Sequence, residues 1–527
     1  MLKMFALALG LVSLAASAQE NHGDHKLGEV AFPISCNVEA QSRFNMATAW
    51  LHSFEYEAAE KEYQAVAAAD PNCAMAHWGI AMSNYHPLWA PPTSAEMVRG
   101  TVAAEKALKL AGNSGVEAAF INAISVFYKD GQSADYGVRV MAYVEATERL
   151  SSNYPDNDEA AVFHALALIA AGTMDADPTY GVEVKAARIL NDVLARQPQH
   201  PGVSHYLIHG YDYPALAHLA LPAARVYAGI APASAHAQHM PSHIFTRLGL
   251  WEEAVRSNHA AEDAAIAYAK SNALPGAWDE QLHAIDYLAY GYLQLGQTES
   301  VKRVMDRMKA ISRVDPPNFK VAYTLSAVPA RFALERRAWV EAASLALPAN
   351  ALGIVSWDKF GWARANIHFA RAIGSARLGN IEAARVEIAE LEQIRKNLVA
   401  KKGEYDWGTQ VEIQRQVAAA WLELADGRGE RALDMMQQAA TLDESAEKHP
   451  VTPGSILPAR EQVGELLMHL QKPAEALLEF EASLKRAPGR LNSLRGAARA
   501  ARKSGKVKAA KTYNSQLAAL KLNKSGD

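Results

Sequence analysis

"AQSRFNMATAWLHSFEYEAAEKEYQAVAAADPNC", residues 40–73, contains the pattern that decides the fold. Small and aromatic residues recur in it at helical spacing, and a proline follows the last helical residue. This is the pattern of two amphipathic helices joined by a tight turn, with small residues where the two helices cross. The residues that carry it are Ala47, Trp50, Tyr56, Ala59, Tyr63 and Pro71. Residues 40–73 therefore predict a helical hairpin.

The same register returns along nearly all of the chain that follows. It is marked by Gly249, Trp251 and Ala254, then by Gly296, Ala342, Leu378, Gly379, Ala384 and Ala432, and most clearly by Ala476 and Phe480, which recur 34 residues later as Ala510 and Asn514. These positions resemble the tetratricopeptide repeat (TPR). The resemblance implies an all-α fold, a right-handed α-solenoid of stacked helix-turn-helix repeats with inserted loops. The first helix of each repeat would line its concave face.

The chain begins with a segment that is not part of the repeats. Residues 1–18, "MLKMFALALGLVSLAASA", combine a basic Lys3, an apolar run and a small-residue site, which is typical of a secretory signal peptide. A membrane anchor is the weaker alternative, because the run is shorter than the ~20 residues of a spanning helix. We therefore expect an exported protein, periplasmic or secreted. The expected parts are a tail over residues 19–38, an N-terminal solenoid with the histidine block over 39–270, central repeats with insertions over 271–445, and a C-terminal repeat pair with a tail over 446–527.

Two cysteines, Cys36 and Cys73, are the only ones in the sequence. In the repeat register each precedes the first helix of a repeat, so both lie at the same end of neighbouring parallel helices. In an oxidising compartment this arrangement predicts a disulfide that closes the N-terminal end of the solenoid. Two buried free thiols are the alternative.

Charge gives little indication of a polyanionic partner. The formal net charge is −4, with both signs interspersed, so we expect no nucleic-acid binding. No segment after the signal peptide is apolar enough to span a bilayer. The sequence does not indicate an oligomeric state.

Histidines gather in the middle of the chain. Ten of the eighteen lie between residues 164 and 283, and seven of these fall between 200 and 243. The pairs His205/His239 and His209/His243 are each separated by 34 residues, which is the repeat length. Stacked repeats would therefore bring these sequence-distant histidines side by side on equivalent helices.

The geometry of stacked helices predicts that these four imidazoles share one patch of the concave face. Residues four apart lie on one helix face with β-carbons about 5–6 Å apart, and neighbouring helices pack at about 8–10 Å. Pro241 disturbs the spacing, because proline is tolerated only in the first turn of a helix. We therefore expect a helix to begin near Met240 and His239 to lie on the loop before it.

Imidazole and carboxylate groups within such reach are typical ligands of transition metals. The sequence predicts a divalent metal ion, Zn²⁺ or Cu²⁺, bound by His205, His209, His239 and His243. Four more residues fall at concave positions, two in the same repeats and two in the next one, and are candidates for further ligands or for groups that hold the ligands: Asp212, His236, His283 and Asp286.

Two other interpretations of the histidine block stay open. The imidazoles can line a metal-free polar groove for a peptide or a small anion, or they can be packing residues. The segments "HPGVSHYLIHGYDYP" (200–214) and "IAPASAHAQHMPSHIFTRLGLWEEAVRSN" (230–258) resemble a group of secreted bacterial TPR proteins with a histidine-rich centre. That group has no established activity. The resemblance implies that the histidines act as a unit, and it assigns no reaction.

Three functions are compatible with these patterns. The first is an exported repeat protein with a metal site on its concave face, and the second is a scaffold that grips a peptide or protein without metal. The third is a metal-dependent enzyme, a hydrolase or an oxidoreductase, with Asp212, Asp279, Glu280 or Asp286 as general base. No metalloprotease, P-loop, nucleophile-elbow or dinucleotide motif occurs, so the catalytic residues and the reaction stay unassigned.

Overall fold

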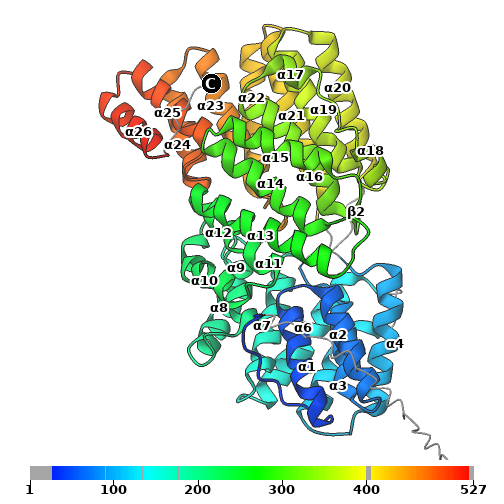
Figure 1. The fold of residues 1–527 in the computed structure, drawn as a ribbon. Coiled ribbons are helices and arrows are strands. Elements are labelled where there is room, and N and C mark those ends of the chain that lie inside the picture. Colours follow the sequence, from blue (N-terminus) through cyan, green and yellow to red (C-terminus); the bar gives the residue numbers. More distant parts are fainter. Residues whose placement is uncertain are drawn as a thin grey trace, which may run out of the picture.

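The chain folds into stacked pairs of antiparallel helices, which confirms the predicted all-α class (Figure 1). The computed structural model describes residues 26–88, 91–129, 131, 134–174, 177–398 and 405–520. The predicted signal peptide lies outside these residues. Within them, two short strands, β1 (Ala277–Trp278) and β2 (Val314–Asp315), pair in parallel. None of the described helices is long and apolar enough to cross a membrane.

The N-terminal half of the described chain consists of helices that each pack on the next. These are α1 (Val38–His52), α2 (Tyr56–Ala69), α3 (Ala74–Ser83), α4 (Ser94–Leu110), α5 (Val116–Tyr128), α6 (Tyr136–Asn153), α7 (Asp158–Gly172), α8 (Gly181–Leu194), α9 (Pro201–Gly210), α10 (Ala217–Ile230), α11 (Ala235–His239), α12 (Pro241–Leu248) and α13 (Trp251–Ser271).

The C-terminal half continues the stack. Its helices are α14 (Asp279–Gln294), α15 (Thr298–Ala310), α16 (Phe319–Glu335), α17 (Trp339–Ala343), α18 (Ala351–Ile354), α19 (Gly361–Arg377), α20 (Ile381–Asn397), α21 (Trp407–Ala425), α22 (Gly429–Ser445), α23 (Ala459–His469), α24 (Pro473–Arg486), α25 (Leu491–Lys503) and α26 (Val507–Ala519).

The first repeat shows why the quoted pattern folds as it does. The Asn37 side chain accepts a hydrogen bond from the Ala40 amide and so caps α1. Tyr63 of α2 is fully buried and lies against Gly79 of α3, where a β-carbon would come within 2.3 Å of its ring. Close helix packing at this point therefore requires the glycine. Cys36 and Cys73 precede α1 and α3 and form a disulfide with a Cα–Cα distance of 5.1 Å, as predicted.

The segment before α1 is part of the packed structure. Leu27 and Phe32 are buried, and backbone hydrogen bonds tie this segment to the ends of α8 and α10. The Glu29 amide donates to the Gln199 carbonyl at 2.9 Å, and the Ala233 amide donates to the Lys26 carbonyl at 3.2 Å. Residues 26–34 thus form an N-terminal strap across the entry to α9.

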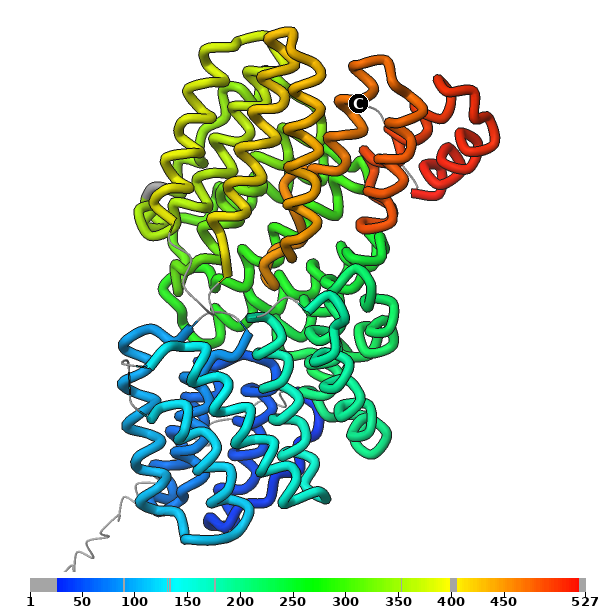
Figure 2. The backbone as a smooth tube through the Cα atoms, turned by 180° about the vertical axis from the view of Figure 1, so that it is seen from behind, coloured from blue at the N-terminus to red at the C-terminus, as the bar shows by residue number. Residues whose placement is uncertain are grey.

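Buried apolar side chains form two large clusters. One runs from Leu27 to Ala254 and the other from Trp251 to Ala510, so the two clusters meet at the start of α13. In Figure 2 the first half of the chain, coloured blue to green, forms the lower part of the molecule. The second half, coloured green to red, forms the upper part. The solenoid therefore has two cores that share one helix.

The solenoid also folds back on itself. The Trp251 indole N–H of α13 donates to the Gly489 carbonyl at 2.9 Å, and Gly249 lies where a β-carbon would come within 2.2 Å of the Pro488 carbonyl oxygen. The buried Arg490 guanidinium pairs with Glu335 and Glu461 at 2.8 Å. The last helix pairs therefore pack against the middle of the chain.

Candidate metal centre

Six buried histidines from four helices converge where the two halves meet. His205 and His209 lie on α9, His236 and His239 on α11, His243 on α12 and His283 on α14. Their exposed fractions range from 0% for His205 to 9% for His209. The predicted open patch on the concave face is thus closed, because Phe54 from the α1–α2 turn and Lys448 from the α22–α23 loop lie over it.

The proline between His239 and His243 separates two short helices. Pro241 occupies the first position of α12, as its missing N–H requires. The expectation that His239 lies on a loop is wrong, because five residues before the break form α11 and His239 is its last residue. The break still leaves the His239 and His243 Nε2 atoms 2.9 Å apart.

The histidines form two triads rather than the predicted group of four. In the first triad, His205, His209 and His236 each offer a nitrogen within 4.8 Å of the others. The His205 Nδ1–H donates to the His52 carbonyl at 2.6 Å, so its Nε2 carries a lone pair, which faces His236 Nε2 at 3.1 Å. His209 Nε2 is buried and has no hydrogen-bond partner among the described residues.

The second triad consists of His239, His243 and His283, whose ligand nitrogens also lie within 4.8 Å of one another. The His239 Nδ1–H donates to Asn258 Oδ1 at 2.7 Å, and the Asn258 amide is oriented by donating to the Ala254 carbonyl. The His243 Nδ1–H donates to Asp212 Oδ2 at 3.0 Å. Both rings therefore direct Nε2 lone pairs into the triad.

Facing rings of the two triads are about as far apart as the most widely separated rings within one triad. Ring centroids of His209 and His243 are 6.3 Å apart, and those of His236 and His239 are 6.2 Å apart. Within the first triad, His209 and His236 are also 6.3 Å apart. The six imidazoles thus form one continuous cluster.

Burial keeps all six imidazoles neutral. Removal from water is the largest cause in each case, and it lowers the pKa of His209, His239 and His243 to about 3. The same cause, followed by neighbouring imidazoles, holds the pKa of His205, His236 and His283 well below the usual 6.5. Neutral imidazole is the form that binds metal.

The predicted carboxylates have different roles. Besides His243, Asp212 accepts from Arg247 at 2.8 Å and from Lys448 at 2.8 Å. Burial alone would raise the pKa of Asp212, but these two cations hold it well below its ordinary value. Asp286 instead pairs with Arg331 at 2.6 Å and contributes no atom to a triad.

The other two candidate bases, Asp279 and Glu280, pair with the buried ammonium group of Lys320. Both carboxylates are buried, with exposed fractions of 3% and 4%. They contribute no atom to a triad.

A third buried group of candidate ligands, which was not predicted from the sequence, consists of His52, Glu159 and His200. Hydrogen bonds within the protein occupy both ring nitrogens of each histidine and both carboxylate oxygens. The Glu159 carboxylate accepts from His52 Nε2 at 2.9 Å and from His200 Nε2 at 3.0 Å. The other nitrogen of His52 bonds the Tyr206 hydroxyl, and that of His200 accepts from the Val203 amide. This group is a closed structural network. His52 lies 107 residues before Glu159, and His200 lies 41 residues after it, so the 34-residue repeat spacing does not relate them.

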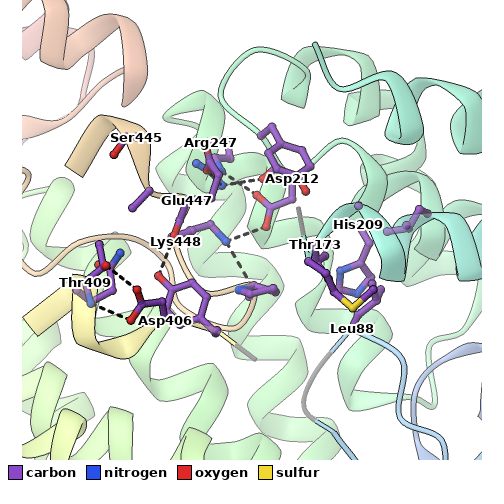
Figure 3. Close-up of a pocket in the computed structure, with 18 of the residues that line it drawn as sticks. Leu88, Thr173, His209, Asp212, Arg247, Asp406, Thr409, Ser445, Glu447 and Lys448 are labelled. Carbon is purple, nitrogen blue, oxygen red and sulfur yellow. Dashed lines mark hydrogen bonds and ion pairs between the residues drawn. The ribbon is translucent and has the colours of Figure 1, made fainter. Parts of the chain in front are cut away.

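A pocket of about 410 Å³ borders the first triad (Figure 3). His209 lies in its wall beside Thr173 and Leu88, and Asp212, Arg247 and Lys448 lie across from them. The rest of the lining is mixed: it includes the apolar or aromatic residues Ile169, Met174, Tyr213, Tyr405 and Leu442 and the polar residues Asp406, Thr409, Gln410, Ser445 and Glu447. A pocket large enough for a small molecule therefore borders the histidine cluster.

Comparisons with known proteins extend only to distant solved structures. No family model matches the chain, and no curated protein matches it. The structure of yeast Tom70 has 12% identity and a TM-score of 0.37, and the alignment covers 89% of this chain and 96% of that chain. The human IFIT1 dimer with m7Gppp-AAAA has 12% identity and a TM-score of 0.38, with 85% and 90% covered. Identities this low assign no activity to the chain.

Proposed function

We propose that this protein is an exported helical-repeat protein that binds a transition metal ion through its buried histidine cluster. The observation that carries the proposal is the contact between His239 and His243. Their Nε2 atoms lie 2.9 Å apart, and each ring has its Nδ1–H committed to an acceptor. Two lone pairs facing each other repel, and a cation between them removes the repulsion.

The groups behind the rings support the same proposal. Metal-binding histidines characteristically donate their other N–H to a carboxylate, an amide or a carbonyl, which fixes the tautomer and the ring orientation. Asp212, Asn258 and the His52 carbonyl occupy these positions for His243, His239 and His205. The Tyr287 hydroxyl, 3.2 Å from His243 Nε2, can donate to at most one of the two facing lone pairs.

The donor set favours zinc or copper. Both triads offer imidazole nitrogen only, without a carboxylate, and both cysteines are joined in the disulfide. Neutral imidazole suits Zn²⁺ and copper, whereas Mg²⁺ and Ca²⁺ prefer oxygen ligands. The six imidazoles are buried, so the scaffold alternative gains no support from the cluster.

Metal content of the untagged protein tests the proposal. The wild type should carry zinc or copper at a fixed ratio after mild purification or after reconstitution. His239→Ala/His243→Ala should lose the ion held by the second triad because it removes the two facing nitrogens. The matched control is His218→Ala/His259→Ala, which also removes two imidazoles but lies outside both triads. Equal metal content in the two variants would rule out the site.

A further inference from the structure

The first triad has the features of a second metal site. The His205 Nδ1–H is committed to a carbonyl, so its Nε2 lone pair points at the His236 ring. His209 Nε2 is buried without a partner among the described residues, which is costly for a polar atom unless a ligand satisfies it. Three nitrogens within 4.8 Å of one another can therefore coordinate one ion.

Two ions held by adjacent triads would lie close together. The rings that face each other across the boundary between the triads have centroids 6.2 and 6.3 Å apart, which matches the most widely separated rings within a triad. Three protein ligands leave a fourth position for an exogenous ligand on each ion. In two-metal sites the ions are about 3.5–4 Å apart and share such a ligand.

The chemistry of the six donors selects copper among the ions that accept imidazole. All six are neutral nitrogens, and no carboxylate is present to favour non-haem iron or manganese. For a given nitrogen site, affinity among divalent first-row metals is highest for copper. Stacked helices hold all six rings in a buried, rigid surround.

The pocket gives an exogenous ligand a way to reach this centre. His209 belongs both to the first triad and to the wall of the 410 Å³ pocket. Thr173 stands beside it and is exposed (Figure 3). On the opposite side, Asp212 connects the pocket wall to His243 of the second triad.

We propose that the two triads form a dinuclear copper centre that binds a small oxygen- or nitrogen-donor ligand entering through this pocket. The inference rests on the proposed function, since the second triad is one half of the centre. It adds a second ion, a bridging ligand and an entry route.

Copper stoichiometry with spin counting tests the dinuclear centre. The full-length mature protein, reconstituted with Cu²⁺, should bind two ions per chain. Its double-integrated electron paramagnetic resonance intensity should be well below two spins, because bridged ions couple magnetically. His205→Ala/His236→Ala and His239→Ala/His243→Ala should each retain one ion and show one full spin. The control His218→Ala/His259→Ala should match the wild type.

The outcomes separate this inference from the proposed function. A wild type with a single ion, or with two full and independent spins, overturns the dinuclear centre and leaves metal binding intact. A wild type that binds no metal overturns both. These wild-type measurements decide the matter even where a histidine variant fails to fold.

Azide, a small anion that binds Cu²⁺, tests the entry route. The wild-type copper protein should develop an azide-dependent absorption band. Thr173→Trp, which fills the pocket beside His209, should lose that band at azide concentrations that saturate the wild type while keeping two ions. The control Val507→Trp places the same indole on an exposed position of α26. Wild-type azide binding by Thr173→Trp overturns the route.

Discussion

Asp212 is the residue on which the most interactions of the site converge. Its carboxylate accepts a hydrogen bond from the Nδ1–H of His243. It also pairs with two buried cations, Arg247 of α12 and Lys448 of the α22–α23 loop. A carboxylate in this position fixes the tautomer of a metal-binding imidazole and raises its basicity. Asp212 thus acts through His243 and positions it.

Replacing this carboxylate should weaken metal binding without removing a ligand. We expect Asp212→Asn to lower the affinity for metal about 10- to 100-fold, as changes behind a ligand typically do. A competition titration against a chromophoric chelator measures this. Asp286→Asn is the matched control, because it also deprives a buried arginine of its carboxylate but lies outside the triads. Equal losses in both variants would mean that the effect is one of folding.

Repeat spacing pointed to the histidine block, but it predicted one group of four rather than two triads and could not predict how the rings are held. His205, His209, His239 and His243 were found by their 34-residue intervals. Asn258 was missed because it lies on α13, the second helix of its repeat, and its role follows from one side-chain contact. Asp286 has the right position in the repeat, yet Arg331, 45 residues away, binds it instead.

At the scale of helices, the disulfide joins the starts of α1 and α3. Its half-cystines are separated by 37 residues, so the bond closes the loop that contains the first helical hairpin. α1 also packs on α9, which carries two of the histidines, and supplies the His52 carbonyl that accepts from His205. The end of the solenoid and the first triad therefore depend on the same helix.

Removing the disulfide should destabilise this end of the protein. For a loop of this length the chain-entropy relation gives about 3–4 kcal/mol. In Cys36→Ala/Cys73→Ala we expect the free energy of unfolding of α1–α3 to fall by this amount. Hydrogen exchange of the backbone amides in these helices measures the change. A reductant should reproduce the loss in the wild type and leave the variant unchanged. Unaltered protection of α1–α3 in the variant would contradict the expectation.

For the whole molecule, the repeat pattern predicted the stacked helices but not the way the stack folds back. A 34-residue register describes contacts between neighbouring repeats only. The return of the last helix pairs depends on single contacts, such as Trp251 to Gly489 and Arg490 to Glu335, that join residues over 150 positions apart. Nothing in the register marks these residues, so the return of the last helix pairs was not predicted.

Buried neutral histidines make the stability of the whole protein depend on pH. Their folded pKa values, about 3 for His209, His239 and His449, lie below the unfolded value of 6.5, so the unfolded chain binds more protons under acid conditions. Their contribution is complete above pH 6.5 and is lost as the pH falls toward 3. In metal-free protein we expect a loss of roughly 1.4 kcal/mol per histidine for each pH unit below 6.5.

Urea unfolding at a series of pH values measures this slope. His218→Ala, which removes an exposed histidine, should follow the wild-type profile. A free energy of unfolding that stays constant between pH 7 and about 5 would contradict the linkage.

The N-terminal strap limits how far the chain can be shortened. Residues 26–34 bury Leu27 and Phe32 and bond to the backbone just before α9, the helix that carries His205 and His209. Removal of these residues would take two buried side chains out of the N-terminal core and break the backbone bonds to Gln199 and Ala233. Truncated variants should therefore keep Lys26 and the residues that follow it.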